Sequence, residues 1–218
     1  MTDTAATETR ARSTLGVGIR TVVSRMPATI VFVLALLAVG VIWQGLWRSF
    51  KHNPLFAEVA YGLPAFLEGR WWTPVTGTFF VVHPWVYLIT IASFVGMGYL
   101  EWRRGTRVAL AYYTVGQLFA IFASALALWL LAFTPWPWAQ REALALDVGP
   151  SGGTMACLAA AASLLPSPWR SRAWLVLLGG GAVALLYWGS LADIEHTFAI
   201  LLVLVVARPL RVRRVSVQ

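Results

Sequence analysis

Residues 147–165, DVGPSGGTMACLAAAASLL, join a loop of glycine, proline and serine to a short apolar run. The run predicts a helix over Ser151–Leu165, which the Pro166-Ser167-Pro168 sequence terminates. Such a helix is about 22 Å long at 1.5 Å per residue, shorter than the roughly 30 Å hydrocarbon core of a bilayer. If its lower end lies at the cytoplasmic face, Ser151 lies inside the membrane, where irregular backbone must be buried or must line a wet cavity.

The composition places this helix in a polytopic membrane protein. The chain has 218 residues, of which 59% are hydrophobic and 12% charged, against about 25% charged in an average soluble domain. The net charge of +8 is spread over the ends of apolar segments, so no nucleic-acid partner is expected. A single cysteine, Cys157, excludes an intramolecular disulfide and argues against a cysteine metal cluster. No metal or cofactor is implied.

Six apolar segments can be drawn between proline, glycine and arginine boundaries. They are predicted as membrane helices over Pro27–Trp47, Gly77–Leu100, Arg107–Phe133, Ser151–Leu165, Ala173–Trp188 and Ala192–Ala207. We therefore expect an all-α membrane protein, a six-helix bundle over residues 27–207 between basic tails at residues 1–26 and 208–218.

The basic residues predict the orientation of these six segments. With the N-terminus in the cytoplasm, 13 of the 17 Lys and Arg residues fall on the cytoplasmic side. The bias holds at every connection, as the positive-inside rule requires. The expected location is the cell (inner) membrane, with both termini cytoplasmic.

Two polar residues are predicted at similar depth in the outer half of this bundle. Ser151 begins the short fourth segment, and His196 lies about 18 Å above the cytoplasmic edge marked by Arg208. A neutral imidazole within hydrogen-bond reach of a serine hydroxyl can take its proton during attack on a carbonyl. The alternatives are a helix N-cap for Ser151 and an interhelical or interfacial polar residue for His196. Asp193 and Glu195 are expected to mark the water boundary.

The ordered motifs resemble those of rhomboid intramembrane serine proteases. Gly149–Gly152 (GPSG) is similar to the family's Gly-x-Ser-Gly, and Glu101–Gly105 (EWRRG) to its Glu-x-x-x-Gly junction. Gly69–Thr73 (GRWWT) resembles part of its first loop, and His196 stands where its last helix has the base. The resemblance implies a rhomboid-like bundle with Ser151 as nucleophile and His196 as base.

The chain departs from this family in the groups that assist the dyad. The family's second span has His-x-x-x-Asn, whereas here His83 is followed by Tyr87. Candidate groups for oxyanion stabilisation or substrate approach are Gly149, Gly152, His83 and Thr90. Other expected positions are changed, and they are occupied by Thr73, Met155, Ala199 and Val203. The last two changes predict looser packing between the fourth and sixth helices.

Three hypotheses follow for the function. The first is cleavage of single-span membrane proteins near the outer face by Ser151 and His196. The second is a rhomboid pseudoprotease that binds transmembrane helices of clients without cutting them. The third is a small transporter or channel, which ranks last because ionisable residues do not line a path through both leaflets. The expected partners are transmembrane segments of other proteins and the lipid bilayer.

Overall fold

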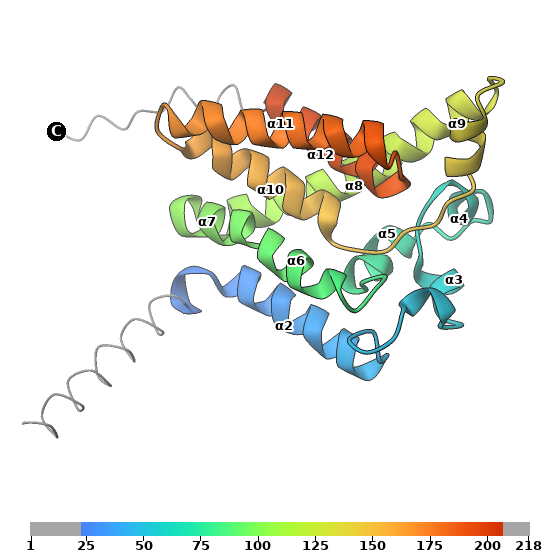
Figure 1. Cartoon of the computed structure of the whole chain (residues 1–218). Helices are drawn as coiled ribbons and strands as arrows, with labels where there is room; N and C mark the ends of the chain where they lie inside the picture. The colour runs from blue at the N-terminus through green and yellow to red at the C-terminus, as the bar shows by residue number, and fades with distance from the viewer. Residues whose placement is uncertain (1–22, 207–218) are drawn as a thin grey trace, which may run out of the picture.

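The structure is a computed structural model that describes residues 23–206, and this part of the chain is all-helical (Figure 1). The long helices are α2 (Pro27–Ile42), α6 (Val86–Ser93), α7 (Val95–Arg104), α8 (Thr106–Ala132), α10 (Ser151–Leu164), α11 (Trp169–Tyr187) and α12 (Leu191–Val206). The shorter ones are η1 (Phe50–His52), α3 (Phe56–Val59), α4 (Leu63–Leu67), α5 (Thr73–Thr76), η2 (Gly77–Phe79) and α9 (Pro137–Glu142). One isolated antiparallel β-bridge pairs Tyr61 with Asp147.

Helix α10 lies at the centre of the bundle. It packs against α8, α12, α7 and α11, and Figure 1 shows it between α7 on one side and α11 with α12 on the other. Most of its side chains are small and buried, including Ala156, Cys157, Ala159 and Ala160. A central helix of this kind can hold a residue at its N-terminus in fixed relation to several neighbours at once.

Small residues face each other where α8 and α10 pack together. A Cβ atom on Gly116 would lie 2.2 Å from the Ala156 Cβ, and one on Gly153 would lie 2.8 Å from the Tyr113 ring. Glycines therefore let the two backbones approach, as small residues do between membrane helices. Ala199 and Val203, where looser packing against α10 is expected, are both buried, at 0% and 1% exposure, and α12 packs directly against α10.

Several predicted boundaries are confirmed and others are wrong. Helices α8 and α10 begin and end within one residue of the predicted segments, and α12 also matches over its described part. The second segment is wrong at its start, because residues 80–85 are not helical and the helix begins at Val86. Helix α2 ends five residues early, α11 begins four residues early, and α9 was missed because its Pro-Trp-rich sequence resembles a loop.

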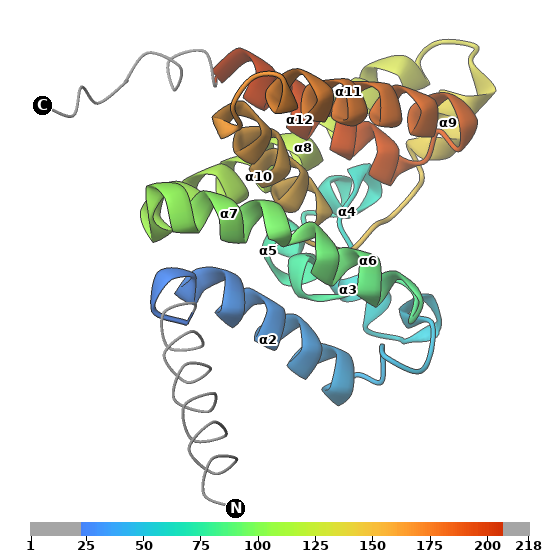
Figure 2. The same cartoon turned by 60° about the vertical axis from the view of Figure 1, so that its left-hand side comes forward.

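Glu101 joins three of these helices at one end of the bundle. Its carboxylate, 1% exposed, accepts hydrogen bonds from the backbone N–H groups of Ala28 and Thr29 at the start of α2, both at 2.9 Å. It also accepts from the hydroxyls of Thr29 at 2.7 Å and Thr106 at 2.8 Å. The negative charge thus satisfies donors that a helix start leaves without intrahelical partners. Figure 2 shows α2 lying beside α6 and α7 as this contact requires.

By length and composition, one helix within residues 23–206, α8, is long and apolar enough to cross a membrane on its own. Helices α2 and α10 are apolar but shorter. The observed fold is therefore an all-helical bundle, and six spans are part of the proposal made below.

Candidate functional site

Ser151 is the first residue of α10, and its hydroxyl does not cap the helix. The N-cap position is taken by Pro150, and no side chain caps the helix. Within residues 23–206, the Ser151 Oγ forms no hydrogen bond, although the side chain is only partly exposed. The alternative interpretation of Ser151 as an N-cap is therefore wrong, because the cap requires a bond from the side chain to the first turn.

The loop before Ser151 is held by hydrogen bonds from three separate segments. Gly149 has φ +144°, a conformation that side chains other than hydrogen disfavour. Its N–H donates to the Gly77 carbonyl at 3.0 Å. Its own carbonyl accepts from the Tyr61 hydroxyl at 3.1 Å and from Gln117 Nε2 at 2.7 Å. Gly149, a predicted site residue, therefore holds the loop and has no free donor for an oxyanion.

The first turn of α10 contains both packed and unpartnered groups. Gly152 is buried against α8, where a Cβ would lie 3.1 Å from atoms of Ala120 and Gln117. Gln117 Oε1 accepts the Gly153 N–H at 2.7 Å. Within the described residues, the N–H groups of Ser151 and Gly152 have no hydrogen-bond acceptor. They are thus the donors at this helix N-terminus that remain for an anionic oxygen.

His196 lies on α12, next to α10, and its imidazole faces a small cavity of about 220 Å³. Its Nε2 atom is buried and has no hydrogen-bond partner among the described residues. The cavity lies between α10, α11 and α12 and is also lined by Met155 and Gly180. Ser151 is four residues before Met155 and therefore on the same face of α10. No hydrogen bond joins Ser151 to His196 in the part of the chain that the structure describes.

The other two predicted site residues lie on or near α6. His83 precedes this helix and stacks on Trp85 at 5.8 Å between ring centroids. Its carbonyl accepts the Val86 N–H at 3.0 Å, whereas its imidazole forms no hydrogen bond within residues 23–206. Thr90 is buried, and its carbonyl accepts the Ser93 hydroxyl at 2.6 Å. Ser93 Oγ also lies 2.9 Å from Thr154 Oγ1, which donates to the Ser151 carbonyl at 3.1 Å. Thr90 is thus connected to the start of α10 through two hydroxyls.

Tyr87, four residues after His83, packs against α2. Its hydroxyl lies so close to α2 that a Cβ on Gly40 would approach it to 2.5 Å. The side chain is 5% exposed. It therefore fills space beside α2, and within residues 23–206 its hydroxyl forms no hydrogen bond.

The prediction that Glu195 lies at the water boundary is wrong. Its side chain is 1% exposed, and both carboxyl oxygens are buried without a hydrogen-bond partner in the part of the chain that the structure describes. The α12 helix turns Glu195 inward. Asp193, by contrast, has partners, because its Oδ2 accepts hydrogen bonds from the Ser190 N–H at 3.0 Å and from the Ser190 hydroxyl at 2.6 Å. Burial raises the pKa of Asp147 in the nearby loop to about 6.

Sequence interpretation missed Gln117, Tyr61 and Thr154, which arrange the Ser151 loop. Gln117 is 3% exposed and bonds Gly149, Gly153 and Thr78. The sequence contained one signal for Gln117, because it is a single amide within the apolar run of α8. Buried polar residues in such helices usually form hydrogen bonds to other helices of the bundle.

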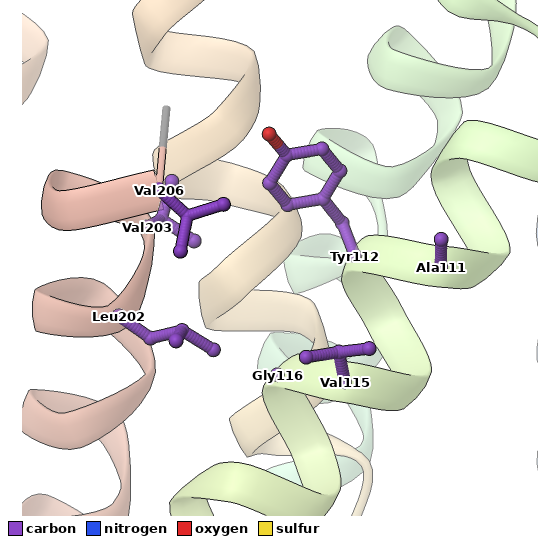
Figure 3. A pocket seen from close by; sticks show the side chains of 7 residues that line it. All are labelled: Ala111, Tyr112, Val115, Gly116, Leu202, Val203 and Val206. Atoms are coloured by element: carbon purple, nitrogen blue, oxygen red, sulfur yellow. The ribbon is translucent and has the colours of Figure 1, made fainter. Parts of the chain in front are cut away.

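A crevice between α8 and α12 is a poor candidate for chemistry (Figure 3). Its volume is about 210 Å³, and the Tyr112 hydroxyl is the one polar side-chain group in a lining of Ala111, Tyr112, Val115, Gly116, Leu202, Val203 and Val206. No cluster of three or more His, Cys, Asp or Glu residues suited to a metal occurs within the described range. No family model, curated protein or solved structure matches the chain.

Proposed function

We propose that the chain is an intramembrane serine protease of rhomboid type, with Ser151 as nucleophile and His196 as general base. The observation that supports this most directly is the Ser151 hydroxyl, which forms no hydrogen bond within residues 23–206 although it lies at the start of a central helix. In the same described range, two backbone N–H groups beside it have no acceptor, and the His196 Nε2 on the adjacent helix has no hydrogen-bond partner. Buried polar groups left unpaired in this way need an explanation, and a reaction site provides one.

In this proposal the Ser151 Oγ attacks the scissile carbonyl of a single-span membrane protein. His196 accepts the hydroxyl proton and then donates it to the leaving amine. The N–H groups of Ser151 and Gly152 stabilise the tetrahedral oxyanion, and water releases the acyl group in a second round. Because no hydrogen bond joins the two side chains, substrate binding has to bring them together; unliganded sites commonly have such loose geometry.

The membrane arrangement belongs to the same proposal. Helix α10 has 14 residues, about 21 Å, so its N-terminus stops short of the outer surface if its C-terminus is at the inner one. The proposed bundle has six spans in the cell (inner) membrane, with both termini cytoplasmic. Cysteine labelling can test this topology, because the natural Cys157 is buried. A cysteine at Gln140 is expected to react from outside in intact cells, and one at Ser167 only after lysis; the reverse pattern overturns the orientation.

The activity is tested with purified protein in liposomes containing a model single-span substrate. Ser151→Ala and His196→Ala are each expected to abolish cleavage. Ser163→Ala is the matched control, because this buried serine on the same helix bonds only to the Ala159 carbonyl. Cleavage that survives either dyad substitution excludes the proposed mechanism.

A pseudoprotease that binds membrane helices is the second candidate. It is favoured by the missing Ser151–His196 bond and by Tyr87, which packs against α2 in place of an oxyanion donor. Loss of one such donor costs about 10²–10³-fold in kcat. A serine-directed fluorophosphonate separates the candidates. Labelling of Ser151 that requires His196 supports the protease, and an unlabelled protein that still captures a transmembrane peptide supports the pseudoprotease.

A further inference from the structure

Two apolar grooves run along opposite sides of α7. The α7–α11 groove, of about 490 Å³, is lined by residues that include Leu158, Trp169, Arg172 and Val176. The α2–α7 groove, of about 620 Å³, has Thr29, Val33, Trp102 and Arg103 among its lining residues. Both volumes lie within the range of about 300–1,000 Å³ typical of ligand sites. Figures 1 and 2 show α7 between α2 and the pair α10 and α11, as this arrangement requires.

The two grooves meet over the exposed face of α7. Val95 and Tyr99 line both of them, and Val95 is 68% exposed. The walls are made almost wholly of apolar side chains. The two grooves therefore form one forked apolar surface with α7 as the ridge between its branches.

Each branch ends at a tryptophan and an arginine on the same side of the bundle. The Arg172 guanidinium lies 5.1 Å from the Trp169 ring centroid, and Arg103 follows Trp102, whose ring lies 4.9 Å from the Arg25 guanidinium. Within residues 23–206, neither Arg103 nor Arg172 forms an ion pair with a carboxylate. Two guanidinium groups thus stand at the open ends of the apolar branches, and no acidic side chain of the described residues neutralises them.

We propose that this forked surface binds one anionic glycerophospholipid, with an acyl chain in each branch and the phosphate between Arg103 and Arg172. The proposal rests on the membrane placement made under the proposed function, and not on proteolysis. In that placement both arginines face the cytoplasmic leaflet, where anionic lipids attract basic residues and tryptophans favour the headgroup level. A transmembrane helix fits less well, because a cylinder of about 10–12 Å cannot enter two branches divided by the α7 ridge.

The test is native mass spectrometry of the full chain in detergent, titrated with phosphatidylglycerol or with phosphatidylcholine of the same acyl chains. Phosphatidylglycerol is expected to bind more tightly. Arg103→Gln and Arg172→Gln are each expected to weaken phosphatidylglycerol binding about fivefold, because one arginine near an anionic lipid contributes about 1 kcal/mol. Arg170→Gln is the matched control, since Arg170 belongs to neither groove lining. Ala173→Leu, which fills the α7–α11 branch without changing charge, is expected to weaken both lipids.

Equal binding of the two lipids, or equal loss in Arg170→Gln, overturns the proposal. Displacement of bound lipid by a transmembrane peptide, with no effect of Arg172→Gln, assigns the surface to a helix and also overturns it. The outcome is separable from that for the protease, because lipid binding is measured without substrate in the Ser151→Ala variant as well. If the protein prefers phosphatidylglycerol but cleaves no substrate, the protease proposal is excluded and the lipid-site proposal stands.

Discussion

Gln117 Oε1 accepts the backbone N–H of Gly153 at 2.7 Å, and this bond connects the middle of α8 to the first turn of α10. The same amide donates through Nε2 to the Gly149 carbonyl, also at 2.7 Å. One side chain therefore holds both flanks of Ser151, the loop before it and the helix that it begins. The position of the candidate nucleophile therefore depends on Gln117 as well as on Tyr61 and Gly77, which hold the same loop.

Replacing Gln117 is expected to destabilise the protein. In Gln117→Ala the buried Gly153 N–H loses its acceptor, and an unsatisfied buried group costs about 1–3 kcal/mol. Thermal unfolding in detergent measures the loss. Gln140→Ala, at an exposed glutamine bonded to the Thr134 carbonyl, is the control and is expected to change stability by less than about 0.5 kcal/mol. Equal effects of the two substitutions would contradict the role of Gln117 in holding the two flanks of Ser151.

Two glycine substitutions are expected to have opposite effects. Gly153→Ala places a methyl group 2.8 Å from the Tyr113 ring and carbonyl, and overpacking of this kind costs about 1–3 kcal/mol. Gly180→Ala on α11 meets no heavy atom within 4 Å, so it gains about 0.5–1 kcal/mol of helix propensity. Unfolding of both variants under one condition checks the difference. A stable Gly153→Ala protein would show that α8 and α10 can separate at little cost.

Ser151→Ala is expected to leave stability unchanged within about 0.5 kcal/mol, because the hydroxyl makes no bond in the described structure. A capping serine would instead cost about 1 kcal/mol. Circular dichroism melting of the purified variant decides between the two values. A large loss would mean that the hydroxyl has a structural partner and would weaken its assignment as nucleophile.

The buried Glu195 is expected to lower stability in the wild-type protein. Both of its carboxyl oxygens lack partners, and burying such a group costs about 1–3 kcal/mol. Glu195→Met keeps a similar length and removes the polar atoms, so its melting temperature is expected to rise. If Glu195→Met melts lower than wild type, the carboxyl has a favourable contact that the structure does not contain.

Glu101 predicts a loss of stability in acid. Burial alone would raise its pKa, but hydrogen bonds from Thr29, Ala28 and Thr106 lower the pKa below its usual 4.5. A carboxyl with a lowered pKa stabilises the folded state above its unfolded value, and this stabilisation is lost as pH falls through the folded value. We therefore expect the melting temperature of the wild-type protein to decrease as the pH drops below about 4.5. The decrease is expected to be smaller in Glu101→Gln, because its amide is uncharged at every pH.

The same substitution also has an expected effect at neutral pH. Each hydrogen bond to a charged group contributes about 1.5–3 kcal/mol, and Glu101→Gln replaces the oxygen that Thr29 contacts through two donors. The variant is therefore expected to be less stable than wild type at pH 7. Glu58→Gln, at an exposed position, is the control. An acid transition of unchanged size in Glu101→Gln would assign the pH dependence to another carboxyl.

The sequence by itself determined the helical class and the limits of the most apolar helices. Helices α8 and α10 were predicted almost to the residue, because long apolar runs bounded by proline, glycine and arginine leave few alternatives. It also singled out Ser151 and His196, since a serine after glycine and proline and an imidazole in an apolar run are both rare enough to notice. Helix limits and unusual single residues depend on neighbours in the sequence, so they can be predicted from the sequence alone.

Only the tertiary structure decided which groups surround Ser151. Gln117, Tyr61 and Gly77 are distant in sequence and meet at Gly149 through hydrogen bonds between different segments. The inward face of Glu195 and the contact of Tyr87 with α2 depend likewise on how α12 and α6 are rotated against their neighbours. Helix rotation is set by the packing of many side chains at once. The groups that hold the loop before Ser151 therefore could not be read from the residues next to it in sequence.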